Sequence, residues 1–345
     1  MSRPVTVLLA HGARRTTTGA DPGAVAGSTE PVRRLERGLA ELDEYRFQYL
    51  DDHHALVREL ANRSDFVLNL ASAGYRNDRS RQLHIPALLE LLGLPYSGPG
   101  PACLALCQDR SAVRAIAAAH GLPVPHELFL QYDTDELPEV VPLPAVVKLA
   151  RSGNSGRKVG AAVARDKPAV ERRVAEFRRA APGQDLLVQE ALEGTAYSLV
   201  LIGNPGAGFI VLPPLEVQGG PKTAGPGPRR YRPAELDDGL RLRLVERATL
   251  LFERLGCRDC ARFDFRADEA ARVRLLKVVP APAWHPDART TRMAELRGWT
   301  YAELLRVLLE TALQRLDSAA GPPVSRPTEG TPAGPHPAPA PGRPR

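Results

Sequence analysis

Arg262 and Asp264 carry opposite charges and alternate with the rings of Phe263 and Phe265. Successive side chains of a β-strand point to opposite faces, so the two polar side chains would share one face and the two rings the other. A carboxylate offers oxygen atoms to a cation, and a guanidinium offers N–H donors to an anion. The same two groups can also satisfy each other as a structural ion pair, so both interpretations stay open.

A second apolar stretch, residues 275–282, follows closely and carries one charge, Lys277. We expect the two stretches to form a hairpin. A charged side chain on so apolar a strand is rarely buried without a partner. Asp264 is the partner that the sequence predicts for Lys277.

Lys148 interrupts the apolar strand 145–149, and the glycine-rich loop 152–156 follows it. Glycines let such a loop turn its backbone N–H groups toward phosphate oxygens. This pattern favours a cation that faces phosphate. A lysine that reaches to the surface, followed by a simple hairpin turn, is the alternative.

The composition is ordinary for a globular protein: the chain has 345 residues, 43% hydrophobic and 25% charged, with a net charge of +6. No basic cluster is interleaved with aromatic residues, so nucleic acid is not an expected partner. No apolar run is long enough to span a membrane, and no leader pattern is recognisable, so the expected location is cytoplasmic. The cysteines, at 103, 107, 257 and 260, are expected in the core, because no histidine completes a zinc-site spacing.

Alternating strand and helix patterns in the first hundred residues predict a doubly wound α/β domain with a parallel sheet. Two α+β lobes should follow, including one long helix over 101–120, a strand over 208–215 and a final helix over 301–316. The expected parts are 1–98, an N-terminal α/β domain; 99–184, a central lobe; 185–317, a C-terminal lobe; and 318–345, a disordered proline-rich tail. Residues 219–230 are rich in Gly and Pro and predict a mobile loop.

Four stretches, in this order, resemble the D-alanine–D-alanine ligase branch of the ATP-grasp superfamily over residues 60 to 316. They are residues 86–98, residues 109–125, Lys148 with residues 153–156, and residues 188–194 with Glu190 and Glu193. The resemblance implies a three-domain ATP-grasp architecture in which two lobes enclose a nucleotide. It also implies carboxylate–amine ligation through an acyl phosphate, with ATP and magnesium.

The resemblance assigns roles to particular residues. Phosphates would be bound by Arg110, Lys148, Gly153, Asn154 and Ser155; adenine by the hinge with Glu190 and Glu193; magnesium by Asp264; and the catalytic cations would be Arg262 and Lys222. Without the resemblance, Glu190 is equally well explained as an exposed carboxylate at a strand end.

The chain departs from the family where the metal ions should bind. Lys277 and Val279 stand where the family has Glu and Asn, and neither offers an oxygen ligand to magnesium. Arg110 replaces a lysine, and Thr223 replaces a tyrosine. Two hypotheses follow: a specialised ligase of reduced activity, or an inactive homologue that binds a nucleotide or a partner.

The substrates are expected to be a nucleotide and an amino acid or peptide. Glu30, at the start of the first long helix, is the one carboxylate near the N-terminus that the family pattern suggests for an amino substrate. Related ligases are commonly dimers, so the resemblance suggests a homodimer.

Overall fold

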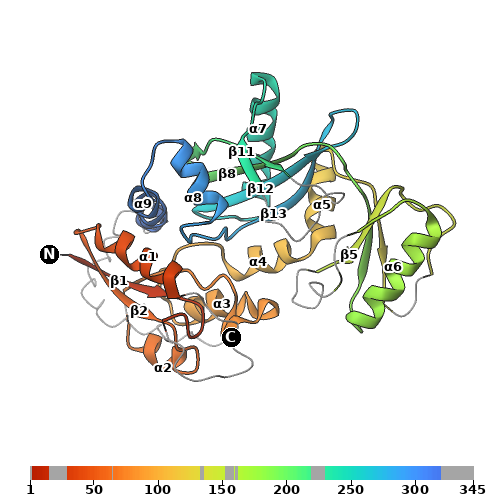
Figure 1. Ribbon diagram of the computed structural model, residues 1–345. Coiled ribbons are helices and arrows are strands. Elements are labelled where there is room, and N and C mark those ends of the chain that lie inside the picture. Colours follow the sequence, from red (N-terminus) through yellow and green to blue (C-terminus); the bar gives the residue numbers. More distant parts are fainter. Residues whose placement is uncertain are drawn as a thin grey trace, which may run out of the picture.

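The computed structural model describes residues 2–14, 29–63, 65–132, 136–151, 159, 162–218 and 230–319. Three separate sheets organise these residues. Figure 1 shows the N-terminal sheet at one end, the middle sheet with α6 at the other, and the largest sheet between and above them. The arrangement confirms the predicted mixture of α/β and α+β parts.

The N-terminal part is built on a parallel sheet in the order β2-β1-β3, as predicted. Its elements are β1 (Arg3–Leu8), α1 (Thr29–Ala40), β2 (Tyr45–Leu50), α2 (Leu56–Ala61), β3 (Phe66–Asn69), the short 3-10 helices Tyr75–Asn77 and Arg79–Arg81, and α3 (His84–Leu91). Val7 and Leu68 are fully enclosed in these strands, and so is the polar Thr6. This sheet directs the ends of β1 and β3 toward the rest of the molecule.

The middle part is a four-stranded sheet in the order β4-β7-β5-β6. Its elements are β4 (Glu127–Leu130), β5 (Ala145–Leu149), β6 (Val163–Ala164), α6 (Lys167–Ala180) and β7 (Leu186–Glu190). Asp166 caps α6, since its carboxylate accepts a hydrogen bond from the N–H of Ala169. A hydrophobic core of its own, with Val170 and Phe177, lies between α6 and this sheet.

The largest sheet has the path β11-β10-β8-β12-β13, with β9 paired to β8. Its elements are β8 (Ala196–Asn204), β9 (Gly208–Val211), β10 (Leu215–Gln218), β11 (Arg230–Pro233), α7 (Asp238–Arg254), β12 (Cys260–Ala267), β13 (Val273–Val279), α8 (Arg289–Leu296) and α9 (Tyr301–Ala319). The predicted hairpin is therefore confirmed as β12–β13. The single strand expected over 208–215 is wrong, because the chain leaves the sheet between β9 and β10.

The long helix expected over 101–120 is also wrong. Two helices, α4 (Pro101–Gln108) and α5 (Arg110–Ala119), meet at Asp109, whose backbone is extended. The Asp109 carboxylate accepts hydrogen bonds from the N–H groups of Ser111 and Ala112, so it caps α5 and starts a new helix. The break directs Arg110 toward the end of β5, where its guanidinium donates to the carbonyl of Leu149.

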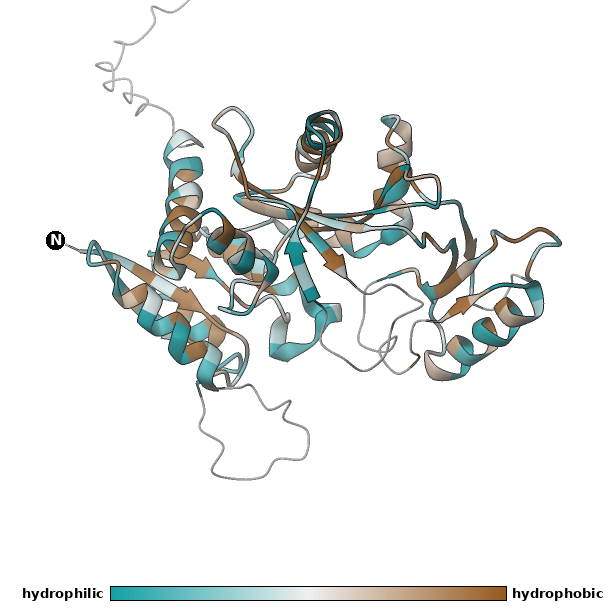
Figure 2. Cartoon of the chain, turned by 45° about the horizontal axis from the view of Figure 1, so that its top comes forward, coloured by the Kyte–Doolittle hydropathy of each residue, from teal (hydrophilic) through white to brown (hydrophobic). Residues whose placement is uncertain are grey.

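Helix α9, the last described element of the chain, packs against both the N-terminal sheet and the largest sheet. Leu305 and Leu309 of α9 pack in one hydrophobic core with Val5 and Val7 of β1. Figure 2 shows hydrophobic residues gathered along the sheets, with hydrophilic residues on outward helix surfaces. The N-terminal sheet and the largest sheet are thus held together by α9.

A β-bulge shapes the functional face of the hairpin. Lys277 stands opposite Asp264, and Leu275 stands opposite Phe265, so Leu276 is an extra residue in β13. A bulge of one residue reverses which side chains point to a given face. Because of it, Lys277 and Arg274 both share the face of Asp264, although they are three positions apart and would lie on opposite faces of a regular strand.

Several predictions fall on residues that the structure does not describe. They are Lys222 and the loop 219–229, Gly153, Asn154 and Ser155, and the tail from residue 320 onward; residues 317–319 belong to α9. Among the described helices, none combines the length and apolar character needed to cross a membrane. The domain bounds, the cytoplasmic location and the homodimer stay predictions.

Candidate functional site: a cationic sheet face and an apolar pocket

The Asp264 carboxylate is bound by arginines, not by Lys277. Arg262 donates to both of its oxygens, from Nε to Oδ1 at 3.0 Å and from Nη2 to Oδ2 at 3.1 Å. Arg289, the first residue of α8, donates to Oδ1 at 3.2 Å, and the Ser198 hydroxyl donates to it at 2.6 Å. Lys277 is in register with Asp264, but it forms no ion pair with it. The predicted Lys277–Asp264 pair is therefore wrong.

The arginines decide the charge state of Asp264. Burial by itself would raise the pKa of this carboxyl, but the positive charges of Arg262 and Arg289 outweigh that effect and lower it. The carboxyl is 18% exposed, and the two arginines are 15% and 14% exposed. Asp264 is thus a carboxylate whose charge is already shared by two guanidinium groups.

Arg289 is the site residue that sequence reasoning missed. Its guanidinium donates to the Ser198 hydroxyl at 3.0 Å and lies over the ring of Tyr231, 5.3 Å from the ring centre. Helix α8 was not predicted, and the contact with Asp264 crosses 25 positions of sequence.

Four cations from four different elements are linked by their charges at this face. They are Arg110 of α5, Lys148 of β5, Arg262 of β12 and Lys277 of β13, and we call them the cation cluster. Burial lowers the pKa of Lys148 well below its usual value, and the charges of Arg114, Arg110 and Lys277 contribute in that order. Lys148 donates to the side-chain oxygen of Gln189, which is neutral. The structure therefore brings together four positions that sequence reasoning had singled out.

Lys277 is the most perturbed of the exposed cations. Loss of hydration and, to a smaller extent, the charge of Arg110 lower its pKa to about 8, although Asp264 opposes the shift. Its side chain is nonetheless exposed. Among the described residues, no hydrogen-bond acceptor or carboxylate pairs with its ammonium group. A lysine with a lowered pKa beside other cations is a site where an anion would be stabilised.

The two predicted hinge carboxylates already have arginine partners. Glu190 accepts a hydrogen bond from Arg274 at 2.6 Å and one from the N–H of His126 at 3.0 Å. Glu193 pairs with Arg165 at 2.7 Å. The Glu190–Arg274 pair ties the middle sheet to β13, so Glu190 has at least a structural role.

Magnesium does not fit the donor set at this face. Both oxygens of Asp264 accept hydrogen bonds from guanidinium groups, and the neighbouring positions Lys277 and Val279 offer no oxygen ligand. In the described part of the chain, no group of three or more metal-binding side chains occurs here. The surrounding cations would repel a divalent ion further.

The described cysteines are all buried, as predicted. The Sγ atoms of Cys103, Cys107 and Cys257 lie within 4.8 Å of one another in the hydrophobic core under the largest sheet. Cys260 is buried on the opposite face, against α8 and α9.

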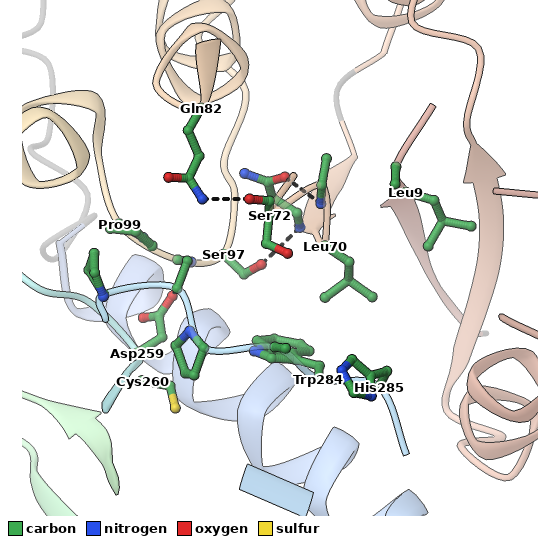
Figure 3. Close-up of a pocket in the computed structure, with 18 of the residues that line it drawn as sticks. Leu9, Leu70, Ser72, Gln82, Ser97, Pro99, Asp259, Cys260, Trp284 and His285 are labelled. Atoms are coloured by element: carbon green, nitrogen blue, oxygen red, sulfur yellow. Dashed lines mark hydrogen bonds between the residues drawn. The ribbon is translucent and has the colours of Figure 1, made fainter. Parts of the chain in front are cut away.

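A pocket of about 220 Å³ lies where the N-terminal part meets the largest sheet. Its lining comes from the ends of β1 and β3, from the start of β12 and from the loop after β13. Figure 3 shows Leu9 and Leu70 on one side, and Trp284 with Asp259 and Cys260 on the other. We call it the apolar pocket. The predicted substrate carboxylate, Glu30, does not line it; Glu30 pairs with Arg37 instead.

Comparisons with known proteins identify the class of this protein as ATP-grasp. The model of the family described as D-ala D-ala ligase C-terminus matches residues 117–310. The chain is 30% identical to a D-alanine–D-alanine ligase of Synechococcus over 71% of this chain and 76% of that protein. It is 31% identical to one of Gluconobacter oxydans over 67% and 76%.

Solved structures show the same fold. The D-alanine–D-alanine ligase of Bacillus anthracis, in complex with ATP, superposes with a TM-score of 0.71 at 18% identity, covering 92% of this chain and all of that one. The chain therefore belongs to the D-alanine–D-alanine ligase family of ATP-grasp proteins.

Proposed function

We propose that the protein binds the triphosphate of ATP at the cation cluster without a divalent ion held by its own side chains. The observation that carries this proposal is the occupation of Asp264 by Arg262 and Arg289, next to an unpaired Lys277. Guanidinium and ammonium groups donate charge-assisted hydrogen bonds to phosphate oxygens. Residues 152–158 and Lys222 lie outside the residues that the structure describes, and the proposal does not depend on them.

For the chemistry, we propose ATP-dependent carboxylate–amine ligation. A carboxylate oxygen of the acid substrate would attack the terminal phosphorus of ATP, so the bond from that phosphorus to the bridging oxygen breaks and ADP leaves. An amine would then attack the acyl carbon, forming the C–N bond and releasing inorganic phosphate and a proton. Arg262 and Lys277 would stabilise the developing negative charge. An amino acid or peptide is the proposed amine substrate.

A second candidate is a protein that binds the nucleotide and does not turn it over. The bidentate Arg262–Asp264 pair favours it, because each hydrogen bond that Arg262 gives to Asp264 is unavailable to a transferring phosphoryl group. The loss of carboxylate-bound ions would also slow phosphoryl transfer, since such ions normally neutralise its charge.

Calorimetric titration with ATP, in a chelator and then in excess magnesium, tests the proposal. We expect ATP to bind in the chelator, and adenosine, which lacks phosphates, to bind much more weakly. Lys277→Met should lower the affinity about tenfold, because one charge-assisted hydrogen bond is lost. Arg254→Met, an exposed arginine at the end of α7, is the matched control and should change nothing.

Binding that appears only with magnesium would rule the proposal out. Release of inorganic phosphate from ATP, with a panel of acids and amines, separates the two candidates: sustained release supports ligation, and binding without release supports the silent protein.

A further inference from the structure

The apolar pocket begins close to the cation cluster. Cys260, which lines it, lies two residues before Arg262 on β12 and on the same face of the sheet. Two residues of a strand span about 7 Å. A small molecule can therefore occupy the pocket and still present one end to Arg262.

The pocket is large enough for more than a methyl group. An apolar cavity of about 150 Å³ in another protein binds benzene, and this pocket measures about 220 Å³. Most of its lining is apolar: Leu9, Ala10, Ala13, Val32, Leu35, Leu70, Ala71, Leu104 and the segment Pro280–Trp284 contribute to it. A ring or a branched hydrocarbon chain matches both its size and its surface.

Three polar side chains of the lining, those of Asn69, Gln82 and Ser97, are occupied by contacts within the protein. The Asn69 side-chain oxygen accepts from the N–H of Ala71, and the Ser97 hydroxyl accepts from the N–H of Asn69. Gln82 donates its amide to the carbonyl of Ser72. These bonds, drawn as dashed lines in Figure 3, fix the turn after β3.

The charged side chains of the lining have partners too: Arg258 lies 3.8 Å from Glu90 and donates to the Tyr96 hydroxyl at 3.4 Å. Asp259, the one carboxylate among the described lining residues, is about 0% exposed. It pairs with Arg315 at 2.7 Å and accepts from the N–H of Gly98 at 2.7 Å. No carboxylate of the described lining remains for a substrate ammonium group, which would be costly to bury unpaired.

From these contacts we infer that the acid substrate is an apolar carboxylic acid that carries no α-ammonium group. Its hydrocarbon body occupies the apolar pocket, and its carboxylate points toward Arg262. This inference rests on the proposed ligation for the direction of the carboxylate, while occupancy of the pocket can be measured without ATP.

The test compares two ligands that differ only in the ammonium group, 3-phenylpropionate and D-phenylalanine. Trp284 lines the pocket, and Trp299 is the only other tryptophan, so fluorescence of the Trp299→Phe protein reports on the pocket. In the absence of ATP we expect 3-phenylpropionate to bind at least about tenfold more tightly than D-phenylalanine, since the latter buries an unpaired charge. Equal or tighter binding of D-phenylalanine, or of D-alanine, overturns the inference.

Variants make the result specific to the pocket. Ala10→Leu fills the pocket and should abolish binding of 3-phenylpropionate, whereas Ala40→Leu, the same change on the exposed end of α1, should not. Ser72→Asp places a carboxylate at the exposed rim and should shift the preference toward D-phenylalanine. If neither ligand binds, or if Ala10→Leu binds like the parent, the pocket is structural only and the inference fails.

Failure of the proposed function would give a different result. 3-Phenylpropionate would bind as expected, whereas ATP would not bind in the presence of a chelator.

Discussion

Within the β12–β13 hairpin, Asp264 lies beside two arginines and a lysine, whose positive charges outnumber its one negative charge; just before the hairpin, the carboxylate of Asp259 is enclosed by partners from the protein. Both aspartates are paired with arginine. Asp264 faces Arg262, Arg289 and the neighbouring Lys277, which has no acidic partner among the described residues. The bonds of Asp259 all end within the protein, at Arg315, Asn204 and Gly98. This difference supports the two proposals made above: that the face of Asp264 binds an anion, and that the apolar pocket beside Asp259 binds an uncharged group.

The largest expected effect is on Asp259. Asp259→Ala would leave Arg315 without its partner in a buried position, so we expect the free energy of unfolding to fall by about 3–5 kcal/mol. The positive φ of 62° at this position adds strain for alanine. Urea denaturation measures the loss. Asp287→Ala, whose carboxylate is 69% exposed in its pair with Arg34, is the control and should lose about 1 kcal/mol or less.

If the Asp259→Ala protein has the same free energy of unfolding as the parent, the contacts of Asp259 with Arg315 and Gly98 do not stabilise the fold. Asp259→Asn should lose less than the alanine variant, because asparagine tolerates positive φ.

The second-largest effect should come from substitutions that give the cationic face oxygen ligands for a metal ion. In the double variant Lys277→Glu with Val279→Asn, a carboxylate replaces a cation that we propose contacts phosphate. We expect the affinity for ATP in a chelator to fall on the order of 100-fold, and magnesium to restore much of it. Calorimetric titration measures both values. An unchanged affinity in the chelator would mean that Lys277 lies away from the phosphates.

A smaller effect should follow from Arg289→Met. Asp264 and Ser198 each lose one hydrogen bond from a charged group, so the free energy of unfolding should fall by about 1.5 kcal/mol. Arg292→Met, one turn further along α8, is the control; its pair with Glu295 is 60% and 47% exposed, and such pairs contribute little. Equal losses in the two variants would show that Arg289 is an ordinary surface arginine.

The smallest expected effect is a dependence of the ATP affinity on pH. Lys277 is charged below its pKa of about 8 and neutral above it, and bound phosphate would raise that pKa. The affinity for ATP in a chelator should therefore weaken as the pH rises through this value. Titrations at several pH values check this, and Lys277→Arg, which stays charged, should flatten the profile. A flat profile in the unaltered protein would exclude Lys277 from phosphate binding.

Local patterns predicted much of this molecule. The alternation of Arg262 and Asp264 with two phenylalanines identified the hairpin and the side chains that share its face, because strand periodicity is a local property. The break at Asp109 was missed, since the apolar residues on both sides continue a helical pattern, and only the capping by Asp109 ends it. The Arg289–Asp264 contact and the bulge at Leu276 depend on tertiary packing, which no local pattern reports.

Helix α9 also has a mechanical consequence. Its leucines pack with β1, and Arg315 links Asp259 to the carbonyl of Tyr96. These contacts hold the N-terminal sheet and the largest sheet together. The middle sheet keeps a separate core. We expect that the middle sheet moves relative to the other two sheets when the protein opens to admit a nucleotide. The Glu190–Arg274 contact would hold the closed position.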